Sequence, residues 1–375
     1  MQNTESTVSV DSGVLIRAVE LTVISPCRNE RQNIRPLVAK LHKCLQGIEW
    51  EVVFVDDDSH DGTADEIREV AQADRRVRCL QRIGRSGLST AVIEGMLSSS
   101  ARYLAVIDAD MQHDEGLLSA MLDALRSQEY DIVVGSRYAD GGGVGTWDQK
   151  RARMSAFATR LARLVIKHEV SDPMSGFFMI TRQGFESSVR NVSGFGFKIL
   201  LDLFASAPKP LRVKELAYEF RTRQFGESKL DSMVMIEYAL LLIDKLLGGL
   251  VPPRFIMFAA VGTLGVAVHL SLLRLAMGFS DFVTSQAIAT VVAMTFNFAL
   301  NNVLTYRDRR LRGTRFVWGL LSFYAVCSIG ALANVGIAAN LYKEHYSWLM
   351  SGIAGILVGV VWNYVMSAAF TWRKA

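Results

Sequence analysis

The chain has 375 residues, half of which are hydrophobic, and its mean hydropathy is positive. This composition is unusual for one soluble domain and typical of a soluble domain joined to a membrane domain. The net charge of +4 does not indicate nucleic-acid binding. The four cysteines form no C-x-x-C pair, so they indicate neither a zinc site nor a disulfide framework.

Residues 1–20 form a polar extension, and residues 21–136 alternate between strand-like and helix-like patterns. The extension lacks a basic segment followed by an apolar run, so it is not a secretory signal, and we expect the N-terminal part in the cytosol. Short apolar runs at 21–25, 50–55, 76–81, 102–107 and 130–135 predict strands, with amphipathic helices such as 34–45 and 64–74 between them. This order predicts a mostly parallel sheet covered by helices on both faces.

Ligands of such sheets bind beyond the carboxyl ends of the strands, where this sequence becomes polar or acidic four times. After the fourth strand, Asp108, Asp110 and Gln112 are spaced two apart and leave on one side if the chain stays extended past Ile107. Two carboxylates and an amide oxygen suit Mg²⁺ or Mn²⁺, with a substrate phosphate as the expected partner. His113 is out of phase, and we leave it out of the ligand set.

The D-x-D motif alone is weak, because such pairs also occur at helix caps and Asp114 is a credible N-cap. The second strand exit, "VDDDSHDGT", adds an acidic turn in which Asp57 is placed to accept hydrogen bonds from a nucleobase. Asp61 and Thr63 are interpreted as turn and helix-cap residues. The chain contains neither a dinucleotide-binding fingerprint nor a P-loop, and the glycine run at 141–145 is interpreted as a flexible linker rather than a mobile loop beside the site.

Four long apolar segments, 255–273, 282–306, 316–342 and 346–372, predict transmembrane helices. The loop 307–315 carries five arginines, so the positive-inside rule places this loop and both termini in the cytosol.

The second and fourth spans repeat each other: "NFALNNVLTYR", 297–307, aligns without a gap with "NYVMSAAFTWR", 363–373. The domain therefore reads as two duplicated hairpins. We interpret the asparagines as interhelical hydrogen-bonding residues and the aromatic–arginine ends as interfacial anchors.

Two further segments, 147–169 and 228–248, are amphipathic and carry basic residues. They are too polar to span a bilayer, and they fit either the headgroup layer or ordinary packing on the sheet.

Taken in order, several motifs resemble the inverting GT-A glycosyltransferases, and within them the dolichol-phosphate (polyprenyl-phosphate) mannose synthases. They are "SPCRNE", "VDDDSHDGT", "RIGRSGLSTAVIEG", "DADMQH", "VVGSRY", "DPMSGF" and "RTRQFGESKL", from residue 21 to about 230. The membrane half is similar to the four-helix GtrA-like domain. This resemblance implies an α/β GT-A domain over 21–230, an amphipathic interface helix or linker over 231–253, and an all-α membrane domain over 254–375.

The resemblance also implies roles for individual residues. The nucleotide pocket would be lined by Pro26, Arg28, Glu30, Val55, Asp57, Asp108 and Ala109. The metal would be held by Asp108, Asp110 and Gln112. Arg137, Arg223 and Lys229 would clamp the acceptor phosphate and donor diphosphate, with Asp110, Arg137 and Arg223 as the catalytic set. Arg28 departs from the family, which usually has an aromatic residue near the base.

The function implied by the resemblance is transfer of mannose from GDP-mannose to a membrane polyprenyl or dolichyl monophosphate, with inversion and with Mg²⁺ or Mn²⁺. Glucose from UDP-glucose is the alternative donor. A processive polysaccharide synthase is disfavoured, because its Q-x-x-R-W motif is absent. A transporter or flippase of lipid-linked sugars is disfavoured because only His269 and Arg274 bring ionisable groups near the spans.

Overall fold

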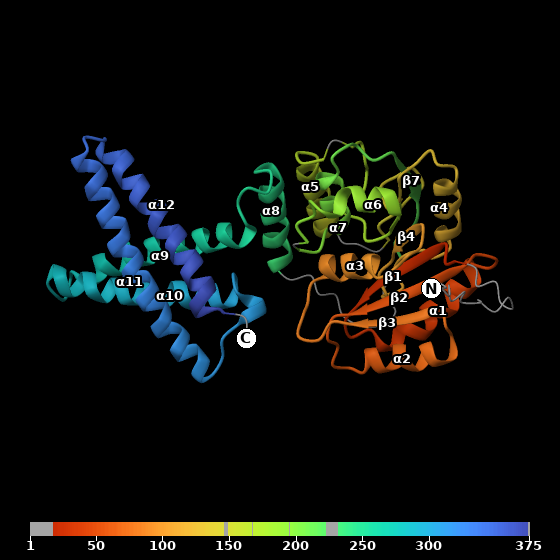
Figure 1. Ribbon diagram of the computed structural model, residues 1–375, viewed down its shortest axis with the longest axis horizontal. Helices are drawn as coiled ribbons and strands as arrows, with labels where there is room; N and C mark the ends of the chain where they lie inside the picture. Colours follow the sequence, from red (N-terminus) through yellow and green to blue (C-terminus); the bar gives the residue numbers. More distant parts are fainter. Residues whose placement is uncertain (1–17, 146–148, 167, 195, 223–231, 374–375) are drawn as a thin grey trace, which may run out of the picture. The chain divides into compact units, whose positions relative to one another are not determined.

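The computed structural model describes residues 18–145, 149–166, 168–194, 196–222 and 232–373 (Figure 1). It divides into two compact units, Met1–Leu246 and Leu247–Ala375. Most of the predicted polar extension lies outside the described residues, as does residue 230, the predicted end of the GT-A domain.

A seven-stranded sheet forms the centre of the first unit, in the order β3-β2-β1-β4-β6-β5-β7. The five predicted strands are confirmed, and the mostly parallel sheet with them. The exception is β6, which runs antiparallel to β4 and β5 and which, like β7, was not predicted. The strands are β1 (Leu21–Cys27), β2 (Trp50–Asp56), β3 (Val77–Gln81), β4 (Tyr103–Val106), β5 (Ile132–Ser136), β6 (Phe178–Thr181) and β7 (Val213–Ala217).

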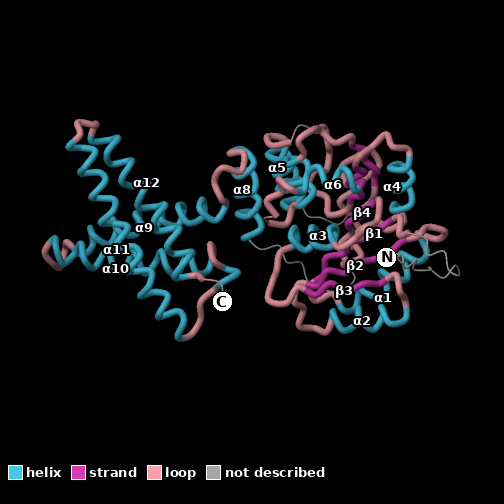
Figure 2. The backbone as a smooth tube through the Cα atoms, in the orientation of Figure 1, coloured by secondary structure: helices cyan, strands magenta, loops and turns pink. Residues whose placement is uncertain are grey.

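Helices cover both faces of this sheet, as the strand–helix alternation predicts (Figure 2). Successive side chains of β1 enter different cores, because strand residues alternate between faces: Val23 packs under α1, α2 and α4, whereas Ile24 packs under α3 and α5 to α8. The helices are α1 (Arg31–Cys44), α2 (Thr63–Ala73), α3 (Leu88–Leu97), α4 (Leu117–Arg126), α5 (Gln149–Ala162), α6 (Arg182–Val189), α7 (Ile199–Ser206) and α8 (Ser232–Leu246).

The two amphipathic segments form α5 and α8, and both pack on the sheet. The Tyr238 hydroxyl of α8 donates to the carbonyl of Ala158 in α5, and Leu241 of α8 is buried in the same core. Each region also keeps large apolar side chains exposed, including Phe157 at 59% and Leu246 at 60%. Packing on the sheet therefore leaves an apolar outer surface.

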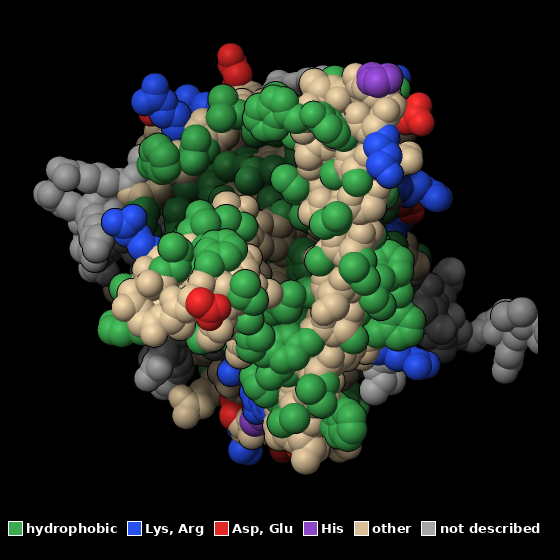
Figure 3. Space-filling model, turned by 90° about the vertical axis from the view of Figure 1, so that its left-hand side faces the viewer, with side chains coloured by type: hydrophobic (Ala, Val, Ile, Leu, Met, Phe, Trp, Pro, Cys, Tyr) green, Lys and Arg blue, Asp and Glu red, His purple; other side chains and the backbone are tan. Residues whose placement is uncertain are grey.

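The second unit contains four helices long and apolar enough to cross a membrane, Pro253–Ala276, Phe282–Val303, Thr314–Lys343 and Trp348–Thr371. They comprise α9 (Pro253–Ala276), α10 (Phe282–Val303), α11 (Thr314–Lys343) and α12 (Trp348–Met366), the last continuing into a π-helical turn, Ser367–Thr371. A short 3₁₀ turn, Arg307–Arg309, follows α10. Apolar side chains cover much of the surface that Figure 3 shows.

The two hairpins, α9–α10 and α11–α12, repeat one contact. A Cβ on Gly265 of α9 would overlap Oδ1 of Asn297 in α10, and a Cβ on Gly330 of α11 would overlap Oδ1 of Asn363 in α12. Neither Oδ1 has a hydrogen-bond partner among the described residues. The prediction of interhelical hydrogen bonding is therefore wrong for Oδ1 of Asn297 and Asn363, but it holds for Asn302, whose Oδ1 accepts from the Trp372 indole (3.1 Å). Because glycine has no side chain, Gly265 and Gly330 instead let Asn297 and Asn363 pack directly against the facing helix.

The repeated aromatic residues are also not interfacial anchors. Tyr306 and Trp372 are both buried, and their rings stack with centroids 4.2 Å apart and planes 5° apart. They share a cluster with Phe258, Phe298 and Phe323. The two ends of the duplicated motif therefore bind each other rather than the bilayer interface.

Candidate active site

The carboxyl ends of β1 and β2 lie side by side, because Pro26 pairs in register with Val55. The loops that follow them are hydrogen-bonded to each other. Glu30 donates its backbone N–H to Thr63 Oγ1 (3.0 Å), and Arg31 donates to Asp61 Oδ2 (3.2 Å). Asp61 Oδ1 accepts from Thr63 N (3.0 Å), which agrees with its predicted role in the turn. The predicted pocket residues Pro26, Glu30 and Val55 are thus held in one rigid framework.

Asp57, the predicted nucleobase contact, lies beside an arginine that sequence reasoning did not single out. Nη1 of Arg82 binds Asp57 Oδ1, and the Gly87 amide donates to Oδ2 (2.7 Å). Burial raises the pKa of Asp57 above its ordinary value, while the Gly87 amide and the charges of Arg82 and Arg28 act in the opposite direction. The signal for Arg82 was present in the sequence, since it opens the "RIGRSGLS" block.

Arg82 is itself almost fully buried and anchored at several points. Nη1 donates to the Gly87 carbonyl (3.1 Å), Nη2 donates to Thr90 Oγ1 (2.6 Å), and Nε lies 3.4 Å from Glu94 Oε2. Charge-assisted bonds of this kind fix geometry as well as adding energy. The Asp57 carboxylate is therefore held in a fixed position by Arg82 and the residues that bind Arg82, a group called the Arg82 wall below.

The acidic motif after β4 is a turn and not an extension of the strand. β4 ends at Val106, and Met111 has φ +65°, in the left-handed region. Asp110 Oδ1 accepts from the Gln112 amide (3.2 Å), a short-range bond that an extended chain cannot form. The strand-alternation argument for Asp108, Asp110 and Gln112 is therefore wrong in its geometry. Ala109, between the two carboxylates, is buried.

The side chain of Gln112 is oriented by the segment that follows β7. Its Nε2 donates to the Arg221 carbonyl (3.0 Å), and the Arg221 amide donates back to the Gln112 carbonyl (2.9 Å). With the amide nitrogen used in this way, Oε1 is the atom left for a cation. Among the described residues no three His, Cys, Asp or Glu side chains form a metal-binding group.

His113 lies against Asp108 inside an aromatic cage. Its Nε2 is 3.3 Å from Asp108 Oδ2, and its Nδ1 is 2.7 Å from the hydroxyl of Tyr218. The rings of Phe177, Tyr218 and Phe220 surround it at centroid distances of 5.3, 5.7 and 5.5 Å. Both ring nitrogens are thus occupied, and His113 fixes the direction of the Asp108 carboxylate. Residue spacing alone gave no sign of this contact.

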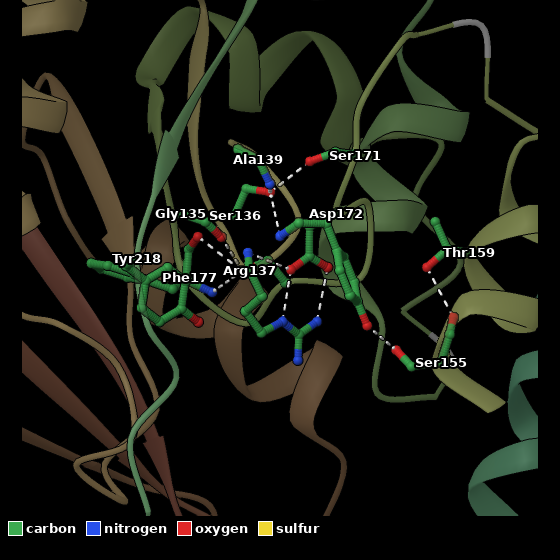
Figure 4. A network of polar contacts seen from close by, with 12 residues as sticks. Gly135, Ser136, Arg137, Ala139, Ser155, Thr159, Ser171, Asp172, Phe177 and Tyr218 are labelled. Carbon is green, nitrogen blue, oxygen red and sulfur yellow. Dashed lines mark hydrogen bonds and ion pairs between the residues drawn. The ribbon is translucent and has the colours of Figure 1, made fainter. Parts of the chain in front are cut away.

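Arg137 is bound by a carboxylate that was also missed. Nε and Nη2 donate to Oδ2 and Oδ1 of Asp172 (2.7 and 2.8 Å), the bidentate arrangement drawn in Figure 4. The guanidinium lies over the rings of Tyr138 and Phe220, at 5.6 Å from each centroid. Burial opposes the charge, but Asp172 raises the pKa of Arg137 above its ordinary value, so the cation is permanent.

Asp172 is positioned in turn by β7. Glu215 Oε1 accepts from the Asp172 amide (3.2 Å), and Glu215 also accepts from the amide and hydroxyl of Ser171. Ser136 and Ser171 share a hydroxyl contact of 2.6 Å beside this turn (Figure 4). The residues before β6 are therefore locked to β5 and β7. Arg223 and Lys229, the other predicted phosphate clamps, lie outside the described residues.

The glycine run at 141–145 is ordered against the same segment. Gly143 donates to the Tyr218 carbonyl (3.1 Å) and accepts from the Phe220 amide (2.9 Å). A Cβ on Gly145 would overlap the Phe220 carbonyl. The flexible-linker interpretation is wrong, because glycine is needed here for close backbone approach.

Comparison with known proteins assigns both units. Residues 22–188 match the model of glycosyl transferase family 2, and residues 257–372 match that of the GtrA/DPMS transmembrane domain. The chain thus joins a glycosyltransferase unit to a membrane unit.

Its relatives narrow this class. A dolichol-phosphate mannosyltransferase of Pyrococcus furiosus is 32% identical over 362 residues, covering 94% of this chain and 99% of that protein. That of Saccharomyces cerevisiae is 35% identical over 231 residues, covering 59% of this chain and 85% of the relative. The chain belongs to the dolichol-phosphate mannosyltransferase family.

A solved structure is also similar to part of the chain. Glucosyl-3-phosphoglycerate synthase from Mycobacterium tuberculosis, crystallised with Mn²⁺, uridine diphosphate and phosphoglyceric acid, is 16% identical with a TM-score of 0.44. The match covers 60% of this chain and 78% of that one. Similarity this low does not transfer the bound groups to this protein.

Proposed function

We propose that this glycosyltransferase moves mannose from GDP-mannose to a membrane polyprenyl monophosphate, with inversion at the anomeric carbon. The observation that carries this proposal is the arrangement at the sheet edge. Asp57 in its Arg82 wall and the Asp108–Gln112 turn both follow strands of one parallel group, in a chain with four membrane spans. A nucleotide diphosphate and a lipid phosphate are the two substrates that such a site would need to hold together.

The residues present fit a hard divalent cation. Asp108, Asp110 and the Oε1 atom of Gln112 are oxygen donors, and two of the three are oriented by bonds to His113 and Arg221. Bound there, Mg²⁺ or Mn²⁺ would supply charge neutralisation for the departing nucleoside diphosphate.

The protein's own contribution is positioning and charge. A phosphate monoester acceptor is already anionic near neutral pH, so its attack needs no strong general base. Arg137, held rigid by Asp172, is suited to stabilise phosphate charge without reorganisation. Arg223 and Lys229 would complete this clamp. Asp57 would accept hydrogen bonds from the base, with exposed Arg28 stacking on its face.

The departure at Arg28 supports one alternative donor. An arginine where the family has an aromatic residue alters the base pocket, so UDP-glucose is the second candidate. The deciding experiment offers membranes containing the full chain a panel of labelled GDP- and UDP-sugars with polyprenyl phosphate and either Mg²⁺ or Mn²⁺. Label from GDP-mannose in the lipid fraction is the expected result. Label in the lipid fraction from UDP-glucose alone would mean that UDP-glucose, and not GDP-mannose, is the donor. The absence of lipid labelling with every donor would favour lipid-linked sugar transport.

We further propose that the catalytic unit lies on the cytosolic face of the cell membrane through α5 and α8. Exposed Phe157, Leu164 and Leu246, together with exposed Arg160 and Arg163, suit the headgroup layer. The arginine-rich loop 307–315 supports the cytosolic placement of both termini. Protease added to intact cells should leave the first unit uncut, whereas protease added to inverted vesicles should cut it; the opposite pattern would reverse the orientation.

A further inference from the structure

Lys245 lies near the end of α8, the last helix before the chain enters α9. Its ammonium group contacts Asp202 Oδ1 of α7 at 2.6 Å and donates to Ser206 Oγ (2.9 Å) and the Asn191 carbonyl (3.2 Å). The Lys245 side chain is 10% exposed and that of Asp202 is fully buried. Separating an enclosed ion pair is costly because it leaves a buried charge without its partner, so this pair holds the end of α8 to the Asp202 carboxylate.

The same carboxylate holds a turn that lies between α6 and α7. Asp202 Oδ2 accepts from Ser193 Oγ (2.7 Å) and from the Gly194 amide (3.1 Å), and Oδ1 accepts from the Ser193 amide (3.3 Å). Gly194 has φ +62°, a conformation that glycine adopts without steric cost. The position of this turn therefore depends on Asp202.

This turn supports the first turn of α3. A Cβ on Gly194 would stand 3.3 Å from Thr90 Cγ2, and the carbonyl of Gly196 accepts from the Ser89 amide (3.4 Å). Close packing of this kind leaves the α3 terminus little freedom to shift.

The first turn of α3 carries the wall behind Asp57. Thr90 Oγ1 accepts from Arg82 Nη2, and the Gly87 carbonyl accepts from Arg82 Nη1. Arg82 in turn pairs with Asp57. The ion pair at the end of α8, the Ser193–Gly194 turn, Gly196 and the first turn of α3 thus link Lys245 to the predicted base contact, all within the first unit.

We propose that Lys245 is a positioning residue for nucleotide binding. Through Asp202 and the Ser193–Gly194 turn it fixes the α3 terminus, and with it the Arg82–Asp57 pair. The role rests on the proposed function, because Asp57 is taken to hold the base. Without the ammonium group, Asp202 would keep a buried charge lacking its counterion, and the turn on which α3 rests would loosen. The placement of the helix that leads into the membrane would thereby set the affinity for the donor.

The test uses the full chain in lipid nanodiscs, titrated calorimetrically with GDP and with UDP in the presence of Mn²⁺. Lys245→Met should raise the Kd of whichever nucleotide the unaltered protein binds by about three- to tenfold. It should also speed hydrogen exchange at the amides of Gly87, Ser89 and Gly194. Lys245→Arg should restore both readouts. Tyr238→Phe is the matched control: it removes the bond from α8 to α5 but not the ion pair, and should change neither.

An unchanged Kd with unchanged exchange in Lys245→Met would overturn the proposal, as would equal changes in Tyr238→Phe. If Lys245→Met does not fold, the double variant Lys245→Met/Asp202→Asn removes the Asp202 charge together with the ammonium group and leaves only the more distant partner of Lys245, Asp244 (3.8 Å), without its cation. It should show the same two changes. If the unaltered protein binds neither GDP nor UDP, the proposed function fails. The exchange data would still decide whether Lys245 fixes the α3 terminus.

Discussion

The two units bury polar groups in opposite ways. The sheet unit encloses paired ions, namely Asp57 with Arg82, Arg137 with Asp172, and Lys245 with Asp202. In the described part of the helical unit, the buried polar side chains are all neutral, and its close contacts include stacked rings and glycine–asparagine pairs. Fixed charges are costly in hydrocarbon but useful where a charged ligand must be held without reorganisation. The difference therefore separates a unit built to handle charge from one built to avoid it.

The largest expected effect comes from removing charge at the sheet edge. Asp110→Ala should lower sugar transfer about a thousandfold while the protein still folds, because a donor to the proposed cation is lost. Asp123→Ala, on the exposed surface of α4, is the control and should keep near-normal rates. Turnover by radiolabel transfer decides the matter. Near-normal transfer with metal dependence intact in Asp110→Ala would contradict the proposed site.

The second-largest effect is expected on stability, when the buried ion pair between Arg82 and Asp57 is broken. Arg82→Met leaves Asp57 buried without its cation and should lower the free energy of unfolding by about 3 kcal/mol. Because the pKa of folded Asp57 is already raised above its ordinary value, the folded state binds its proton more tightly. Stability therefore falls as pH rises from the pKa of Asp57 in the unfolded chain to its higher pKa in the folded protein. Loss of the Arg82 cation raises the pKa of folded Asp57 further and so widens this interval. In denaturant titrations the loss of unfolding free energy relative to the unaltered protein should therefore be greater at pH 8 than at pH 5. Arg85→Met, at an exposed position, should lack both effects.

In the helical unit, where the close contacts are uncharged, a bulky substitution at a glycine contact should reduce stability. Gly265→Val places carbon where Asn297 Oδ1 lies and should destabilise the first hairpin by about 2 kcal/mol. Gly262→Val, one turn away on the same helix, meets nothing within 4 Å and is the matched control. Thermal unfolding in detergent compares the two. Equal melting temperatures would show that close approach at Gly265 is not needed.

A smaller change is expected from the support of the metal-binding turn. His113→Phe fills the aromatic cage but loses the contact to Asp108, and should raise the Kd for Mn²⁺ about tenfold. Electron paramagnetic resonance of free Mn²⁺ measures this directly. Tyr218→Phe removes the second hydrogen bond of the histidine and leaves the contact of His113 with Asp108, so it should have a weaker effect. A larger effect from Tyr218→Phe would mean that Tyr218 acts on the metal by another route.

The smallest effect tests a half-buried histidine within the sheet unit. His168 Nε2 accepts from the Leu211 amide (2.8 Å), and burial lowers the pKa of His168 below its ordinary 6.5. The unfolded chain therefore binds this proton first, and stability is lost as pH falls below about 6.5. His168→Gln should remove this component, a difference of under about 1 kcal/mol between pH 7.5 and 5.5. An identical pH dependence in both proteins would rule out a contribution from His168.

The sequence predicted what depends on local periodicity. Strands β1 to β5 and the four spans follow from short apolar runs and from long uncharged segments. β6 was missed because its identity depends on pairing with β4, a strand more than 70 residues earlier. The motif before β6, "DPMSGF", is typical of a loop when its local sequence is considered alone.

Site partners were harder to predict than site candidates. The strand exits were correctly expected at one edge of the sheet, but Arg82, Asp172 and His113 acquire their contacts only through tertiary packing. The geometry of the D-x-D turn was wrong because nothing in the sequence signals a left-handed Met111, a conformation that is rare for residues other than glycine and asparagine.

The stacked rings of Tyr306 and Trp372 occupy equivalent positions in the two hairpins. The pair thus lies where the two related hairpins meet. Because both copies belong to one chain, equivalent positions can carry different residues. Asn302 accepts from the Trp372 indole (3.1 Å), whereas the position equivalent to Asn302 is Ala368. The aromatic contact is therefore supported from one side only, because the first hairpin supplies a hydrogen-bonding asparagine where the second has alanine.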